Sequence, residues 1–218
     1  MRSTPIISLA ALTLLGAFAA CGGGVSSSAD AQKAYLGLDP SVDKAIALGF
    51  AGFNAPLNGA NISAQFADGG VSGLMTINGR VDQGNSGASK IMTLTDALSS
   101  YSDDGKITYN TDPAALPVLS MSLKGIPTGT LDGSLVGSFL MSGDLTGQVS
   151  LSLTLTGQLE ATADGGVQRK PGMTHVTGTA TASAARPHRH TPSSGRALPP
   201  GRPLVVPVAL CGRGRGAR

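Results

Sequence analysis

The sequence lacks tryptophan and contains few aromatic or charged residues, at 4% and 13% of its 218 positions. Transmembrane β-barrels carry belts of aromatic residues at both membrane interfaces, so three tyrosines and five phenylalanines count against that class. The low charge and the 31 glycines are also unusual for a compact enzyme. They are typical of strands that are built from small residues and joined by turns.

Motifs of common catalytic sites are missing as well. The chain has no G-x-S-x-G sequence, no phosphate-binding glycine loop and no paired cysteine motif. Ser41-Val42-Asp43-Lys44 matches the S-x-x-K sequence of serine acyl-transfer enzymes, but the S-D-N and K-T-G partners of that motif are absent. We interpret it as an ordinary first turn of a helix, and we expect neither enzymatic activity nor a cofactor.

A metal site is not predicted either. Four residues with side-chain oxygens raise the question of calcium: Asp103, Asp104, Asn110 and Asp112. Their spacing places two at a hairpin tip and two at the far end of the returning strand, so turn chemistry accounts for them better. His175 has no acid or nucleophile pattern around it, and the pair His188 and His190 belongs to an atypical C-terminal segment.

That C-terminal segment, residues 185–218, holds seven arginines and no acidic residue. Residues 22–184 hold eight basic and 13 acidic side chains, a net charge of −5, so the basic total of the chain does not indicate a nucleic-acid surface on the body. We predict that residues 185–218 are a disordered tail. Its Arg, Pro, Gly and Ala are all encoded by GC-rich codons, so we hypothesise a reading-frame artefact, with a basic arm that contacts phosphate groups as the alternative.

The first 21 residues have the three parts of an export signal. Arg2 is basic, residues 6–18 are mainly apolar and too few to span a bilayer, and Ala19 and Ala20 are small. Phe18-Ala19-Ala20-Cys21 resembles the lipobox of bacterial lipoproteins. The resemblance implies removal of residues 1–20, attachment of lipid (diacylglycerol and palmitate) to Cys21, and, because Gly22 is not an aspartate, sorting to the outer membrane.

An alternative remains open at this site. Ala17-Phe18-Ala19 also fits an ordinary A-x-A cleavage site, which would leave Cys21 as a free thiol. In either case the Gly- and Ser-rich residues after Cys21 predict a flexible tether over 21–34.

Residues 35–184 are predicted to form one all-β domain. Asp39-Pro40 followed by apolar residues at helical spacing predicts one short N-terminal helix that plugs a sheet. From residue 131 to 161 apolar side chains occupy mainly odd positions, with Val136 and Leu140 as exceptions at even positions. We expect an antiparallel, mostly meander sheet of about seven or eight strands, which forms a curved sheet, a sandwich or a half-barrel. Further strands are predicted at 61–67, 72–83, 116–124 and 174–182.

The parity of the apolar residues also predicts the turns. Because it does not change between 131 and 161, the loops there should have odd lengths, and Ser142-Gly143-Asp144 would pair Met141 with Leu145. Around Asp104-Gly105 the apolar positions change from even to odd, as a two-residue hairpin requires.

These observations predict a non-catalytic, membrane-anchored domain of the cell envelope, on the periplasmic face or the cell surface. Its partner would be the membrane, through the lipid, together with another envelope component. The alternative is a carrier that holds an apolar ligand or lipid in the cavity of a curved sheet, for which glycines on the apolar face would leave room.

Overall fold

The computed structural model describes residues 23–55, 60–184 and, as backbone, 204–210. In these residues it has one helix, α1 (Ser28–Asn54), and eleven strands. The strands are β1 (Gly23–Gly24), β2 (Asn61–Asp68), β3 (Ser72–Gln83), β4 (Ser89–Ser102), β5 (Ile107–Asn110), β6 (Val118–Lys124), β7 (Thr130–Gly143), β8 (Leu145–Ala161), β9 (Val167–Arg169), β10 (His175–Ala184) and β11 (Leu204–Leu210).

The strands form one antiparallel, mostly meander sheet in the order β11-β10-β8-β7-β5-β4-β3-β2. Strand β6 lies between β4 and β7 beyond the end of β5, and β9 pairs with the end of β8. The two-residue β1 is the exception, because it pairs in parallel with the start of β8. The sheet is open, with β2 and β11 at its edges, so the predicted all-β curved sheet is confirmed.

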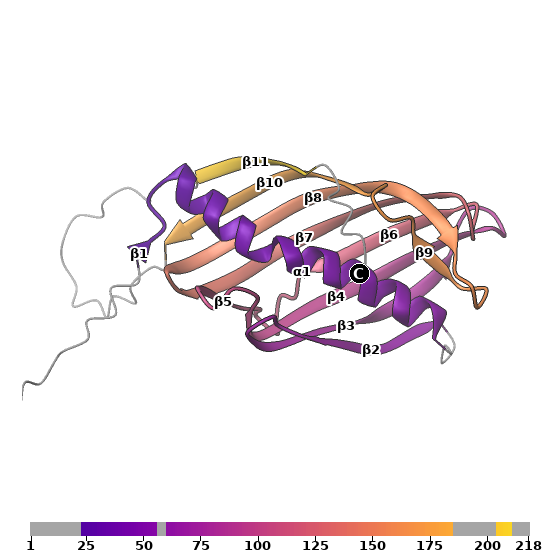
Figure 1. Cartoon of the computed structure of the whole chain (residues 1–218), viewed down its shortest axis with the longest axis horizontal. Helices are drawn as coiled ribbons and strands as arrows, with labels where there is room; N and C mark the ends of the chain where they lie inside the picture. The colour runs from indigo at the N-terminus through magenta and orange to yellow at the C-terminus, as the bar shows by residue number, and fades with distance from the viewer. Residues whose placement is uncertain (1–22, 56–59, 185–203, 211–218) are drawn as a thin grey trace, which may run out of the picture.

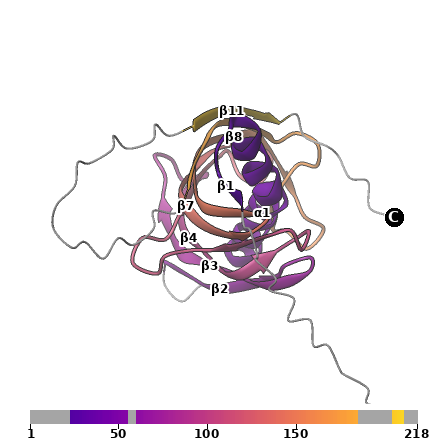
Figure 2. The ribbon, with the colours of Figure 1, turned by 90° about the vertical axis from the view of Figure 1, so that its left-hand side faces the viewer.

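The sheet curves around α1, which lies along its concave face (Figures 1 and 2). The helix contacts β2, β3 and β4 on one side and β8, β9 and β10 on the other. Leu38, Ala45 and Ile46 of α1 are fully buried against the inner side chains of the sheet. Among the described residues, no helix has the length and hydropathy that a membrane span needs.

The helix is much longer than the predicted one. It begins twelve residues before Pro40, because Ser27 caps it: Ser27 Oγ accepts from the Asp30 amide, and the Asp30 carboxylate accepts from the Ser27 amide. Buried Ala31, Ala34 and Leu38 continue the apolar face ahead of Pro40. Burial of this face outweighs the cost of an interior proline, so the predicted flexible tether is wrong for residues 28–34.

The alternation predicted over 131–161 is confirmed. The buried residues of β7 and β8 are at odd positions, among them Leu135, Phe139 and Leu153. The two even exceptions, Val136 and Leu140, lie on the outer face, where 51% and 47% of their surface is exposed. The predicted strands at 61–67, 72–83, 116–124 and 174–182 are also present as β2, β3, β6 and β10.

The connection between β7 and β8 has odd length, as predicted, but its register is different. Met141 pairs with Gly147 rather than with Leu145. The residues between them have other partners, since Ser142 and Gly143 pair with β5 and Leu145 pairs with β1. Competing strands therefore widen the loop by two residues.

The change of parity before Asp104-Gly105 arises inside β4 rather than at the turn. The pairing of β3 with β4 shifts by one residue between Ser72–Ser102 and Leu74–Ser99, and Ser100 has a positive φ of 48°. This β-bulge places Tyr101 on the inner face after a run of even buried positions.

Strand β11 departs from the predicted disordered tail. Residues Leu204–Leu210 pair with Val176–Ala182 of β10 along seven positions. The rest of 185–218 lies outside the described residues, so the hypothesis of a reading-frame artefact stays a prediction.

Candidate functional site

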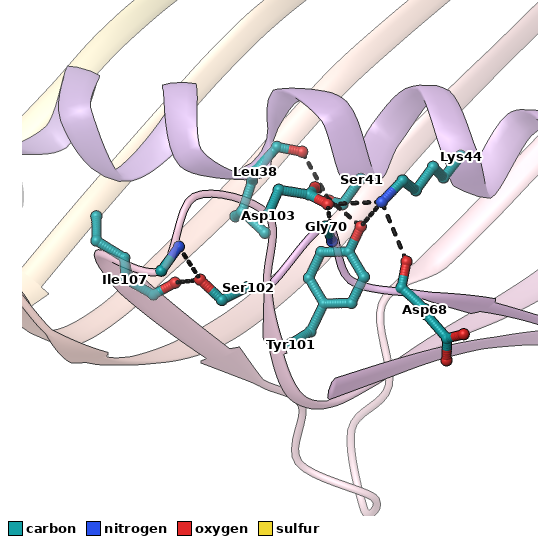
Figure 3. A network of polar contacts seen from close by, with 10 residues as sticks. Leu38, Ser41, Lys44, Asp68, Gly70, Tyr101, Ser102, Asp103 and Ile107 are labelled. Atoms are coloured by element: carbon teal, nitrogen blue, oxygen red, sulfur yellow. Dashed lines mark hydrogen bonds and ion pairs between the residues drawn. The ribbon is translucent and has the colours of Figure 1, made fainter. Parts of the chain in front are cut away.

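Lys44 of α1 is at the centre of a polar cluster that joins the helix to two turns of the sheet (Figure 3). Its Nζ donates hydrogen bonds to Asp103 Oδ1 at 2.6 Å, to Tyr101 Oη at 2.9 Å and to the main-chain oxygen of Asp68 at 3.2 Å. Asp103 also accepts from the Tyr101 hydroxyl at 2.9 Å and from the Gly70 amide at 2.8 Å. All three ammonium protons and both carboxylate oxygens are thus engaged.

Three local features bring this cluster together. The bulge at Ser100 turns Tyr101 toward the helix, and the chain then makes the β4–β5 turn that carries Asp103. Ser102 Oγ stabilises that turn, because it donates to the Ile107 carbonyl and accepts from the Gly105 amide, at 2.7 and 3.0 Å. The neighbouring β2–β3 turn provides the Gly70 amide.

The cluster keeps its acid and its base charged. Burial lowers the pKa of Lys44, but the hydrogen bonds with Asp103 and Tyr101 outweigh burial and hold that pKa above its usual value. Burial raises the pKa of Asp103, but the bonds from Lys44 and Gly70 hold it below its usual value. Burial, and the hydrogen bond to Asp103, raise the pKa of Tyr101 to about 12. A lysine whose pKa is held above its usual value is protonated at neutral pH, which does not suit a general base.

Ser41, the other residue of the S-x-x-K match, is 1% exposed. Its Oγ donates to the Leu38 carbonyl at 2.6 Å, one turn earlier in the same helix. In the described part of the chain no hydrogen bond joins it to Lys44. The motif therefore forms one turn of the helix, which hydrogen bonds from Lys44 join to the sheet.

A second tie between helix and sheet involves Tyr109. Its hydroxyl donates to the Ala34 carbonyl at 2.8 Å, and burial raises its pKa. The ring passes directly under Gly37, where an added Cβ would collide with the Tyr109 hydroxyl oxygen. At Gly49 an added Cβ would also collide, with the side chains of Met121 and Leu94. Glycines on the helix thus let it lie deep in the sheet.

Asp96 is the least expected residue of the interior. It is 1% exposed, and among the described residues neither carboxyl oxygen has a hydrogen-bond partner. It lies on the inner face of β4 between Leu94 and Leu98, and burial raises its pKa to about 7. It was not predicted from the sequence, although an acid at an even position within the alternation of β4 is a visible signal.

The residues considered for calcium are used locally. Asp104 Oδ1 accepts from the Lys106 amide, Asn110 from the Ser100 amide and Asp112 from the Ala114 amide, each at 2.8 or 2.9 Å. Asp103 binds Lys44 instead. No group of three or more His, Cys, Asp or Glu with metal-binding geometry occurs in the residues that the structure describes. His175 is exposed at the start of β10, whereas Cys21, His188 and His190 lie outside the described residues.

One shallow depression of about 340 Å³ lies beside the N-terminal turns of α1. Its lining includes Lys33 and Leu36 of the helix and Asp104 and Lys106 of the β4–β5 turn. The depression is open to solvent, which does not fit an enclosed site for a small molecule.

Comparison with known proteins adds no relative. No protein-family model, no curated protein and no solved structure matches this chain.

Proposed function

We propose that this chain is a lipoprotein of the bacterial cell envelope, with a non-catalytic β-domain that serves a structural or binding role. Export removes residues 1–20, and acyl groups on Cys21 hold the domain to the outer membrane, on its periplasmic face or at the cell surface. The leader carries this proposal: basic Arg2, the apolar residues 6–18 and the lipobox-like Phe18-Ala19-Ala20-Cys21.

The position of the first strand that the structure describes supports the proposal. Strand β1 starts at Gly23, two residues after Cys21, and Val25 is 9% exposed. This is compatible with cleavage before Cys21, because that cleavage removes none of the strands that the structure describes.

The polar groups of the interior support a non-catalytic role. Hydrogen bonds join Lys44, Tyr101 and Asp103 to one another, and the Ser41 hydroxyl donates to a carbonyl of its own helix. Exposed apolar side chains are instead found on the outer face, where Val118 and Val136 are directly paired across β6 and β7. We propose that this face contacts another envelope component.

The alternative, a carrier of an apolar ligand, requires space that α1 fills. The helix lies along the concave face of the sheet (Figure 1), and its Leu38, Ala45 and Ile46 are all at 0% exposure. A ligand would need the helix to leave this position. Extraction of lipid from gently purified protein tests this alternative, and a lipid-free protein would contradict it.

The deciding experiment is the intact mass and N-terminal sequence of the protein from the membrane fraction of its native host. We expect a chain that begins at an acylated Cys21, and a Cys21→Ser variant that leaves the membrane fraction. A chain that begins at Ala20 and carries no lipid would show that the A-x-A site is used and that the proposed anchor is wrong.

A further inference from the structure

Three turns lie together at one end of the sheet, which we name the anchor end: residues 69–71, 103–106 and 143–144. The Val71 amide donates to the Ser102 carbonyl, and the Asp144 amide donates to the Lys106 carbonyl, at 3.0 and 2.9 Å. Lys33 of α1 forms an ion pair with Asp144 at 2.9 Å, which brings the first turns of the helix to the same end. Figure 2 looks onto this end.

The chain enters the domain here. Gly23 and Gly24 pair with Leu145 and Thr146, the first residues of β8. An extended chain advances at most about 3.6 Å per residue, so the Cα of Cys21 is within about 7 Å of that of Gly23. A lipid on Cys21 therefore holds the anchor end close to the bilayer and leaves no length for a long flexible spacer.

Large apolar side chains are exposed at the anchor end. Val71 is 63% exposed at the tip of the β2–β3 turn, and Leu36 is 54% exposed on α1, on the far side of the β4–β5 turn. Around Leu36 the side chains of Lys33, Lys106, Asp104 and Asp144 carry two positive and two negative charges, and Lys33 pairs with Asp144.

We propose that the anchor end rests on the membrane, with Val71 and Leu36 inserted at the lipid interface. The inference rests on the proposed anchor at Cys21 and adds an orientation to it: the long axis of α1 rises from the bilayer, and the outer face of β6 and β7 remains free. Apolar side chains that enter the interface next to the acyl chains bury further apolar area there, which favours this orientation of the domain.

The absence of tryptophan provides a clean test. The mature chain, starting at Cys21 and carrying Cys211→Ser, is coupled through its single thiol to a maleimide lipid in phosphatidylcholine vesicles. Val71→Trp then introduces one fluorescent probe, which lipids brominated in their acyl chains quench if it enters the bilayer. Leu36→Trp is a second probe, in case the first variant fails to fold.

Met173→Trp is the matched control. Met173 is 43% exposed and precedes β10 at the opposite end of the sheet, where His175 pairs with Thr156. At about 3.3 Å per residue, Leu145 and Thr156 of β8 are roughly 35 Å apart, beyond the reach of the bilayer in the proposed orientation.

We expect blue-shifted, strongly quenched emission from Trp probes at 71 and 36 and no quenching of the probe at 173. Unquenched probes at 71 and 36, or equal quenching at both ends, would overturn the orientation. Since the vesicle supplies the lipid chemically, this result is separate from acylation in the host. An unacylated Cys21 in the host would overturn the anchor itself, whereas unquenched probes together with an acylated Cys21 would overturn only the membrane contact.

Discussion

Asp96 should make the stability of this domain fall as the pH rises. Burial raises its pKa from 3.8 to about 7, with both carboxyl oxygens unpartnered. Between these two values the unfolded chain has lost the proton and the folded chain still binds it. The favourable contribution of this group is therefore complete below pH 3.8 and is lost progressively as the pH rises through 7.

The size of the effect follows from the shift. One pKa unit corresponds to about 1.4 kcal/mol, so the ionised Asp96 destabilises the fold by about 4 kcal/mol in full. Roughly 3 kcal/mol of this loss should occur between pH 5 and pH 8, a large share of the usual stability of a domain.

Urea unfolding followed by circular dichroism measures this loss. The wild-type chain and Asp96→Asn are compared at pH 5 and pH 8, and Asp132→Asn, an exposed carboxyl that pairs with Lys124, is the control. We expect the asparagine variant at position 96 to gain stability relative to wild type by roughly 3 kcal/mol between the two pH values. If its pH dependence equals that of wild type and of the control, Asp96 is not buried as an unpartnered acid.

The ties of α1 give two further predictions. Lys44→Met leaves the Asp103 carboxylate, which is 12% exposed, without its cation. This variant should lower the free energy of unfolding by about 2 kcal/mol. The control Lys124→Met breaks an exposed ion pair and should change the free energy of unfolding far less in the same urea titration. Ser27→Ala removes the side-chain half of the capping box and should lower the free energy of unfolding by about 1 kcal/mol. Hydrogen exchange should become faster only in the first turn of α1. Unchanged exchange there would contradict the assigned cap.

The extent of the sheet could be predicted from the sequence, because a period of two that persists over strands as long as β7 and β8 is typical of a sheet with one buried face. The details that failed depend on partners distant in sequence. The β7–β8 register is decided by β1 and β5, which bind the residues that a short hairpin would have used. The parity change in β4 was visible, but a bulge at Ser100 and a two-residue turn at Asp104-Gly105 leave the same pattern in one sequence.

The start of the helix and the polar cluster were missed for different reasons. Residues 28–34 are small and polar, which is typical of a tether. Ala31 and Ala34 are buried only because this part of the chain packs against the concave face of the sheet. Lys44 is 57 positions from Tyr101 and 59 from Asp103, and no local pattern predicts such a contact. A lysine four residues after a proline at a predicted helix start indicates only an exposed position.

The glycines show how one sequence feature supports opposite functions. Glycines on the apolar face of a curved sheet predict an internal cavity, and such a cavity predicts a bound apolar ligand. In this fold the helix occupies that space, and its own Gly37 and Gly49 bring it closer still to Tyr109, Met121 and Leu94. Departure of the helix would require breaking the Lys44 cluster and the Tyr109 hydrogen bond together. An interior that is closed by polar contacts at both halves of its helix fits the proposed structural or binding role better than that of a carrier.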